Sequence, residues 1–239
     1  MIERIIESAI LNDFLRRKVI VLLGARQVGK TTLLESLRKK GQKVFSVNCD
    51  DMDDVLLIEE KTSTELRALL APYDLVFIDE AQRVKNIGLT LKKIGDLKLD
   101  TQVVVTGSSS LELADEVNEP ATGRLIEYRL FPFSLSELAI HTSEREEQRM
   151  LEQRLIYGLY PEVVTFPGDA KRTLMTLANN YLYKDLFSYR GLKKPDVLQK
   201  LLRALALQLG SEVSYNELSN LLGVDKETVE NYIILLEKC

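Results

Sequence analysis

The chain of 239 residues has few of the residues that form cross-links or bind transition metals. It contains two cysteines, Cys49 and Cys239, and a single histidine, His141. Two cysteines do not make a disulfide framework, and they fit the reducing conditions of a cytoplasm. One imidazole without paired cysteines gives no zinc-binding pattern. We therefore expect a cytoplasmic protein that relies on neither disulfides nor zinc.

Long apolar runs and an excess of positive charge are also missing. No stretch approaches the roughly 20 apolar residues that span a bilayer. Residues 1–14 (MIERIIESAILNDF) indicate an amphipathic helix rather than a signal peptide. The net charge is −4 and the isoelectric point is near 5.3, so the overall charge does not favour nucleic acid or an anionic membrane. The length suggests one large or two small domains, with 45% hydrophobic residues to build a core.

The segment GARQVGKTTLL, residues 24–34, has the spacing of a phosphate-binding loop. It follows KVIVLLG (18–24), which has the pattern of a buried strand. It leads into KTTLLESLRKK (30–40), which has the apolar spacing of a helix, with Gly41 as its expected end. A strand, a glycine-rich loop and a helix in this order form the context in which such loops bind phosphate.

We therefore predict a nucleotide site in which Lys30 contacts the β- and γ-phosphates and the Thr31 hydroxyl binds Mg²⁺. The residues expected to contact ATP are Gly24, Ala25, Arg26, Gln27, Val28, Gly29, Lys30, Thr31 and Thr32.

Strand and helix patterns alternate through the next hundred or so residues. Further strands are predicted at 43–51, 74–82, 101–110 and 124–132, and helices at 63–71, with Ser63 as N-cap, and 89–97. Such alternation predicts an α/β fold with a parallel five-stranded sheet covered by helices. Ligands of such sheets bind beyond the carboxyl ends of the strands.

The stretch LVFIDEAQ places two acids at one of these ends. Asp79 is expected to hold Mg²⁺ together with Thr31, and Glu80 to orient and polarise the attacking water. The alternative is a pair of solvated acids that cap the next helix.

Two further segments carry candidates for catalysis. Thr106 and Ser108 follow an apolar strand, where a hydroxyl can bond the γ-phosphate or the attacking water; the alternative is a serine-rich turn. We expect this strand to lie between the loop strand and the acid strand. Arg124 precedes the last strand and could stabilise the transition state in its own site or in a neighbour's; the alternative is a surface arginine.

Together, GARQVGKTTLL, FIDEAQ, VVVTGSSS and GRLIEYRLFPFSLSEL (123–138) resemble the prokaryotic AAA+-type ATPases that carry a C-terminal domain of unknown function. YGLYPEVV (157–164) and NNYLYKDL (179–186) extend the resemblance over the whole chain. It implies a P-loop ATPase core with a catalytic glutamate and Ser108, ahead of Thr106, as the first sensor. It also implies that proteins of this kind continue into a winged helix and a further domain, so we expect this chain to be a shortened form.

The last third of the chain is predicted to be helical. Helices at 135–140, 143–158, 170–191 and 195–210 are expected to form a lid over the nucleotide. Residues 214–238 (SYNELSNLLGVDKETVENYIILLEK) predict a helix-turn-helix around Gly223. Its expected inward residues are Leu218, Leu221 and Leu222 on the first helix and Val229, Ile233 and Leu236 on the second.

Charge argues against DNA recognition by this element. Residues 211–239 hold six acids (Glu212, Glu217, Asp225, Glu227, Glu230, Glu237) against two lysines (Lys226, Lys238). Phosphate contacts dominate affinity for DNA, so DNA is not the favoured partner. We expect three parts: an ATPase core at 1–133, a helical lid region at 134–210, and a partial winged-helix element at 211–239.

The sequence as a whole predicts Mg²⁺-dependent ATP binding and hydrolysis that drives a conformational switch. A homo-oligomer is compatible with this prediction. No guanine-recognition Asn-Lys-x-Asp motif is present, which favours adenine. Glu80 argues against a nucleotide kinase. The Asp-Glu-Ala-Gln string at residues 79–82 resembles a helicase motif, but a helicase of that type would need two such cores, and this chain has room for one. The alternative from another class is a nucleotide-gated DNA- or protein-binding regulator with little or no hydrolysis.

Overall fold

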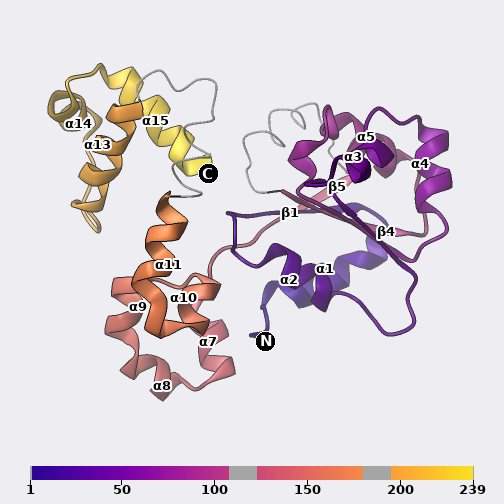
Figure 1. Cartoon of the computed structure of the whole chain (residues 1–239), viewed down its shortest axis with the longest axis horizontal. Coiled ribbons are helices and arrows are strands. Elements are labelled where there is room, and N and C mark those ends of the chain that lie inside the picture. Colours follow the sequence, from indigo (N-terminus) through magenta and orange to yellow (C-terminus); the bar gives the residue numbers. More distant parts are fainter. Residues whose placement is uncertain (1, 108–122, 180–194, 239) are drawn as a thin grey trace. The chain divides into compact units, whose positions relative to one another are not determined.

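Figure 1 shows the computed structural model of the chain, which describes residues 2–107, 123–179 and 195–238. The chain forms two compact units, Met1–Leu174 and Met175–Cys239. The helices of the predicted lid region, 134–210, therefore contribute to both units. The expected three-part division of the chain remains a prediction.

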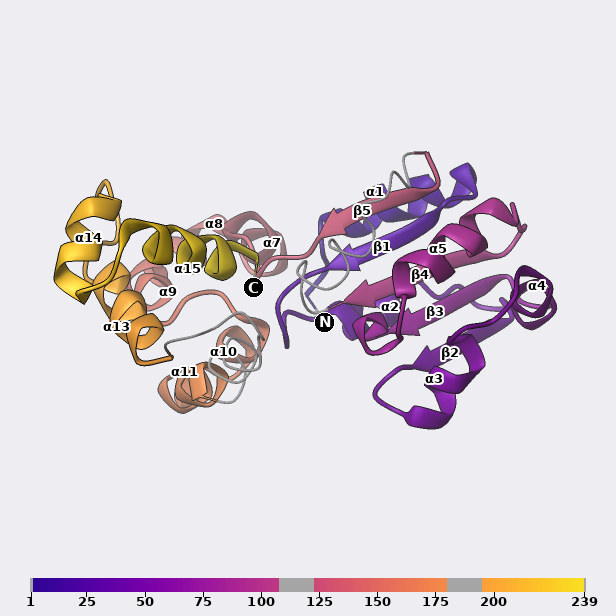
Figure 2. The same cartoon turned by 90° about the horizontal axis from the view of Figure 1, so that it is seen from above.

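The first unit is built on a five-stranded parallel sheet, as the sequence predicted. Its strands are β1 (Val19–Leu23), β2 (Val44–Asn48), β3 (Leu75–Asp79), β4 (Gln102–Gly107) and β5 (Leu125–Arg129). The order across the sheet is β2-β3-β4-β1-β5, which places β4 between the loop strand β1 and the acid strand β3 as expected (Figure 2). Because all strands are parallel, their carboxyl ends meet at one edge.

Helices cover both faces of this sheet, and the alternation of β1 side chains explains why. Val19, Val21 and Leu23 pack into one apolar cluster, while Ile20 and Leu22 pack into another. The first cluster lies under α3 (Met52–Ile58), α4 (Ser63–Leu70) and α5 (Ile87–Asp96), and the second under α1 (Ile6–Asp13) and α2 (Lys30–Ser36) (Figure 1).

Several element boundaries differ from the predictions, and three of the differences have a local cause or bear on the site. Helix α2 ends at Ser36 rather than at residue 40. The strand predicted at 43–51 ends at Asn48, because the Asp51 carboxylate accepts from the Asp53 N–H and begins the unpredicted helix α3. Helix α4 does begin at Ser63, but its N-cap is Thr62, which forms a capping box with Glu65.

Short helices follow the sheet: α7 (Leu135–His141), α8 (Glu144–Arg149), α9 (Leu151–Tyr157), α10 (Pro161–Thr165) and α11 (Ala170–Leu177). The single helix predicted at 143–158 is divided at Met150. Glu147 on α8 and Arg154 on α9 form a buried ion pair, with 3.0 Å between Oε2 and Nε. This pair joins the two helices across the division.

The second unit contains α13 (Pro195–Ala206), α14 (Tyr215–Leu222) and α15 (Lys226–Lys238). The turn at Gly223, with a φ of +66°, separates α14 from α15 as predicted. The predicted inward faces are wrong in part. Leu218 and Val229 are buried as predicted, but Leu221 is exposed. On α15, Tyr232 and Leu235 are buried, each one position before the predicted Ile233 and Leu236. A winged helix remains a prediction.

Within the described ranges, no helix combines the length and the apolar character needed to cross a membrane.

Candidate nucleotide site

Steric constraints fix the glycines of the loop between β1 and α2. A Cβ at Gly24 would lie 2.5 Å from the Leu130 carbonyl oxygen, so no other residue fits there. Gly29 has a φ of +99°, a left-handed conformation that glycine adopts without strain. Gln27 is also left-handed, with a φ of 59°. Successive turns of this kind form concavities that bind anions through backbone N–H groups.

Lys30 is buried within this loop. Its ammonium donates to the carbonyl oxygens of Gly24, at 2.9 Å, and Ala25, at 3.1 Å. It also lies 3.8 Å from the Glu80 carboxylate. The lysine of the loop and Glu80, which directly follows β3, therefore lie close together.

Hydroxyl groups bond the two acids at the end of β3, Asp79 and Glu80. The Thr31 hydroxyl donates to Asp79 Oδ2 at 2.8 Å. The Thr106 hydroxyl donates to Asp79 Oδ1 and accepts from the Glu80 N–H at 3.1 Å. Thr106 is fully buried at the end of β4, so its single hydroxyl fixes both acids at once.

Glu80 has an unusual backbone conformation directly after β3. Its φ is 54° and its ψ is 41°, a left-handed geometry that is uncommon outside glycine. It does not cap the short helix at Ala81–Arg83. Instead, Gln82 Nε2 donates to Glu80 Oε2 at 2.6 Å. The prediction did not assign Gln82, although it lies in the quoted motif.

Other residues at this edge were also missed. Asn48 pairs in register with Asp79, and Arg129 pairs with Leu23, so both end strands beside the site. Their signal in the sequence would have been a polar residue at the carboxyl end of a strand, but the strands predicted at 43–51 and 124–132 extended past both residues. Cys49 lies here too, but burial, reinforced by Asp54 and other nearby acids, raises the pKa of its thiol to about 12. Its thiol therefore stays protonated near neutral pH.

Arg124 does not join the other predicted residues. It directly precedes β5, and Leu125 is in register with Val19, at the amino end of β1. At about 3.3 Å per residue, this amino end lies roughly 16 Å along β1 from the end that leads into the phosphate-binding loop. The arginine pairs with Asp96 of α5. This position does not fit a role in its own chain's site; a role in a neighbouring copy remains a prediction. Ser108 lies outside the described residues.

The donors at the site fit a magnesium–nucleotide complex. Among the described residues, no three His, Cys, Asp or Glu side chains form a metal cluster. Magnesium at nucleotide sites needs only one or two protein oxygens, because phosphates and water supply the rest. The paired Thr31 hydroxyl and Asp79 carboxylate match that need.

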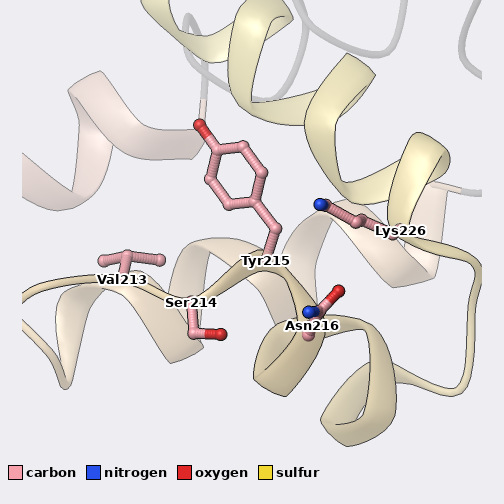
Figure 3. Close-up of a pocket in the computed structure, with 5 residues that line it drawn as sticks. All are labelled: Val213, Ser214, Tyr215, Asn216 and Lys226. Atoms are coloured by element: carbon pink, nitrogen blue, oxygen red, sulfur yellow. The ribbon is translucent and has the colours of Figure 1, made fainter.

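The second unit has a separate cavity of about 340 Å³ (Figure 3). Its lining residues are Val213, Ser214, Tyr215, Asn216 and Lys226. The Ser214 hydroxyl is already used as the N-cap of α14, where it accepts from the Glu217 N–H. Among the described residues of this lining there is no carboxylate that could act as a base or bind a cation.

The fold and the residues at the loop define a P-loop ATPase-like domain. A family model described as an AAA domain matches residues 16–139, slightly more than half of the chain. The chain belongs to this AAA domain family. A second model, described as a domain of unknown function, matches residues 148–239.

Two relatives that match by sequence are themselves uncharacterized. The chain is 25% identical to an uncharacterized protein of Haemophilus influenzae over 94% of its own length and 60% of the relative. It is 24% identical to an uncharacterized protein of Methanocaldococcus jannaschii, over 98% of itself and 57% of the relative. The chain thus spans little more than half the length of these relatives.

Among solved structures, a Walker-type ATPase of Pyrococcus abyssi is similar over 100% of this chain and 89% of that chain. The TM-score is 0.62 and the identity is 17%, so the likeness supports the fold alone.

Proposed function

We propose that the chain binds Mg²⁺·ATP at the carboxyl edge of its sheet and hydrolyses it to drive a conformational switch. The observation that carries this proposal is the convergence at the loop: Lys30 lies 3.8 Å from Glu80, and Thr31 is bonded to Asp79. Lys30 supplies a positive charge for the phosphates, Glu80 supplies a base, and Thr31 with Asp79 supplies a pair of oxygen ligands for Mg²⁺.

Each group has a role in the proposed reaction. Lys30 holds the terminal phosphates in place of the carbonyls that it contacts in the structure. Thr31 and Asp79 hold Mg²⁺, which when bound neutralises charge on the phosphates. Glu80 orients the attacking water and accepts its proton, and Gln82 holds the second carboxylate oxygen of Glu80.

The experiment is ATP hydrolysis by the wild type, Glu80→Gln and Lys30→Ala, each with ATP binding measured separately. Glu80→Gln should bind ATP normally and lose turnover by about 100-fold or more, because the amide cannot accept a proton. Lys30→Ala should lose ATP binding. Glu127→Gln, at an exposed carboxylate on β5, is the matched control and should change neither.

The outcomes separate the proposed ATPase from its alternative. Turnover that survives in Glu80→Gln would remove Glu80 as the base. Tight binding by the wild type without turnover would favour the nucleotide-gated regulator instead. A parallel titration with GTP tests the preference for adenine.

A further inference from the structure

Arg4 lies before α1, outside the matched AAA domain, yet it contacts the phosphate loop. Its side chain is only 9% exposed. Its Nη1 donates to the carbonyl oxygen of Val28 at 3.2 Å, and its Nη2 donates to that of Phe131. Its Nε donates to Glu137 at 3.0 Å, and its guanidinium lies 4.7 Å from the centre of the Phe133 ring. One buried cation thus joins the loop to the segment between β5 and α7.

Glu137 fixes the other side of this cation. Its Oε1 also accepts from the Ile5 N–H at 3.0 Å. Its Oε2 accepts from the Ser134 N–H at 2.8 Å, which completes the capping box of α7. Because both carboxylate oxygens are held by several donors, the orientation of Arg4 is determined on both sides.

The contact with Val28 bears directly on phosphate binding. A trans peptide is planar, so its C=O and N–H point in opposite directions. The Val28 carbonyl points to Arg4; therefore the Gly29 N–H points away from Arg4. Left-handed residues such as Gln27 and Gly29 are typical of loops whose concave side binds anions through backbone N–H groups.

We propose that Arg4 is a positioning residue of the nucleotide site. It holds the Val28–Gly29 peptide so that the Gly29 N–H donates to the β- or γ-phosphate of a nucleoside triphosphate. Glu137 holds Arg4, so the phosphate loop and α7 are coupled through one ion pair. This inference rests on the proposed function, because it assumes that the loop binds phosphate.

Lysine cannot replace arginine in this arrangement. A guanidinium offers donors in a rigid planar fork, whereas an ammonium is a single point of charge. Three separate acceptors surround Arg4, namely Val28, Phe131 and Glu137. Arg4→Lys therefore keeps the charge and the pair with Glu137 but loses the contact with Val28.

The test measures affinity for ribose-labelled fluorescent ATP with Mg²⁺ in the full chain, together with thermal unfolding without nucleotide. Arg4→Lys should weaken binding about tenfold, as expected for the loss of a charge-assisted hydrogen bond. In turnover, KM should rise while kcat stays within about threefold. Arg17→Lys, in an exposed pair with Asp100, is the matched control and should change neither.

A measurement on the wild type covers the case in which the variants fail to fold. With ¹⁵N-glycine labelling, the Gly29 amide should shift on addition of Mg²⁺·ADP, and the exposed Gly41 should not. An unmoved Gly29 amide, or unchanged affinity in Arg4→Lys, would overturn the role of Arg4 while the ATPase proposal stands. Failure of the wild type to bind nucleotide would overturn both.

Discussion

At the scale of residues, Thr106 connects the two acids on which the proposed chemistry depends. Its hydroxyl donates to Asp79 and accepts from the Glu80 N–H, and it is fully buried. The sequence favoured Ser108 over Thr106 for a role near the γ-phosphate. Hydrogen bonding in the structure gives Thr106 a defined position between the acids.

Thr106→Val is predicted to lower both stability and turnover. It replaces the hydroxyl with a methyl group and leaves the Glu80 N–H without that acceptor, which costs about 1–3 kcal/mol when the group is buried. Turnover should fall about tenfold as Glu80 loses its fixed orientation. Thr106→Ser keeps the hydroxyl and should restore most of both. Thermal unfolding and steady-state hydrolysis measure the two effects, and equal turnover in Thr106→Val and the wild type would contradict the prediction.

The site residues that could be predicted from the sequence are those that belong to a short local motif. Gly24, Gly29, Lys30 and Thr31 are fixed by the spacing of one loop, and the structure brings Thr31 to Asp79 as expected. Arg4 could not be found in this way, because its contacts with Val28 and Glu137 join segments far apart in the chain. Such contacts depend on how the chain folds back on itself.

At the scale of elements, α8 and α9 depend on the buried pair of Glu147 and Arg154. The hydrogen bonds from Arg154 lower the pKa of Glu147, and they outweigh the opposing effect of burial. A carboxyl whose pKa is lowered by folding stabilises the folded state above its unfolded pKa. This stabilisation is lost as the pH falls through the lower, folded pKa. The ordinary value for glutamate here is 4.5, so the loss occurs below that pH.

Glu147→Gln is therefore predicted to destabilise the protein in a pH-dependent way. At pH 7 the free energy of unfolding should fall by roughly 2 kcal/mol, because Arg154 is left with a neutral partner. The difference from the wild type should shrink as the pH falls below 4.5. Glu146→Gln, in the exposed pair with Arg149 on the same helix, should cost less than about 0.5 kcal/mol. Urea unfolding at several pH values measures this; a pH-independent difference would contradict it.

Strands were easier to predict than helix limits. Strands β1, β3 and β4 are buried apolar runs, whereas β2 and β5 are more exposed and carry polar residues. All five were nevertheless predicted, and their parallel arrangement followed from the alternation of strands and helices. Helix α3 was missed because Asp50 and Asp51, which precede it, suggested the end of a strand, whereas Asp51 in fact caps the helix. The division at Met150 was missed because apolar spacing alone continues across it.

At the scale of the whole molecule, the proposed site belongs to one of the two units. Lys30, Thr31, Asp79, Glu80 and Thr106 all lie within Met1–Leu174, as do Arg4 and Glu137. Helices α13, α14 and α15 lie in Met175–Cys239. A ligand stabilises the cooperative unit that binds it. Nucleotide binding should therefore stabilise the first unit against unfolding more than the second.

Hydrogen exchange should reveal this distinction in the intact chain. With Mg²⁺·ADP at about 100 times its Kd, the unit that binds is stabilised by about 2.7 kcal/mol. Amides of β1, β3 and β4 that exchange only through unfolding of that unit should then slow by about 100-fold. Amides of α13, α14 and α15 should keep their rates within about twofold. Lys30→Ala should show no slowing in either unit. Comparable slowing in the wild-type helices α13–α15 would mean that the two units unfold together, and that the proposed switch acts on the chain as a whole.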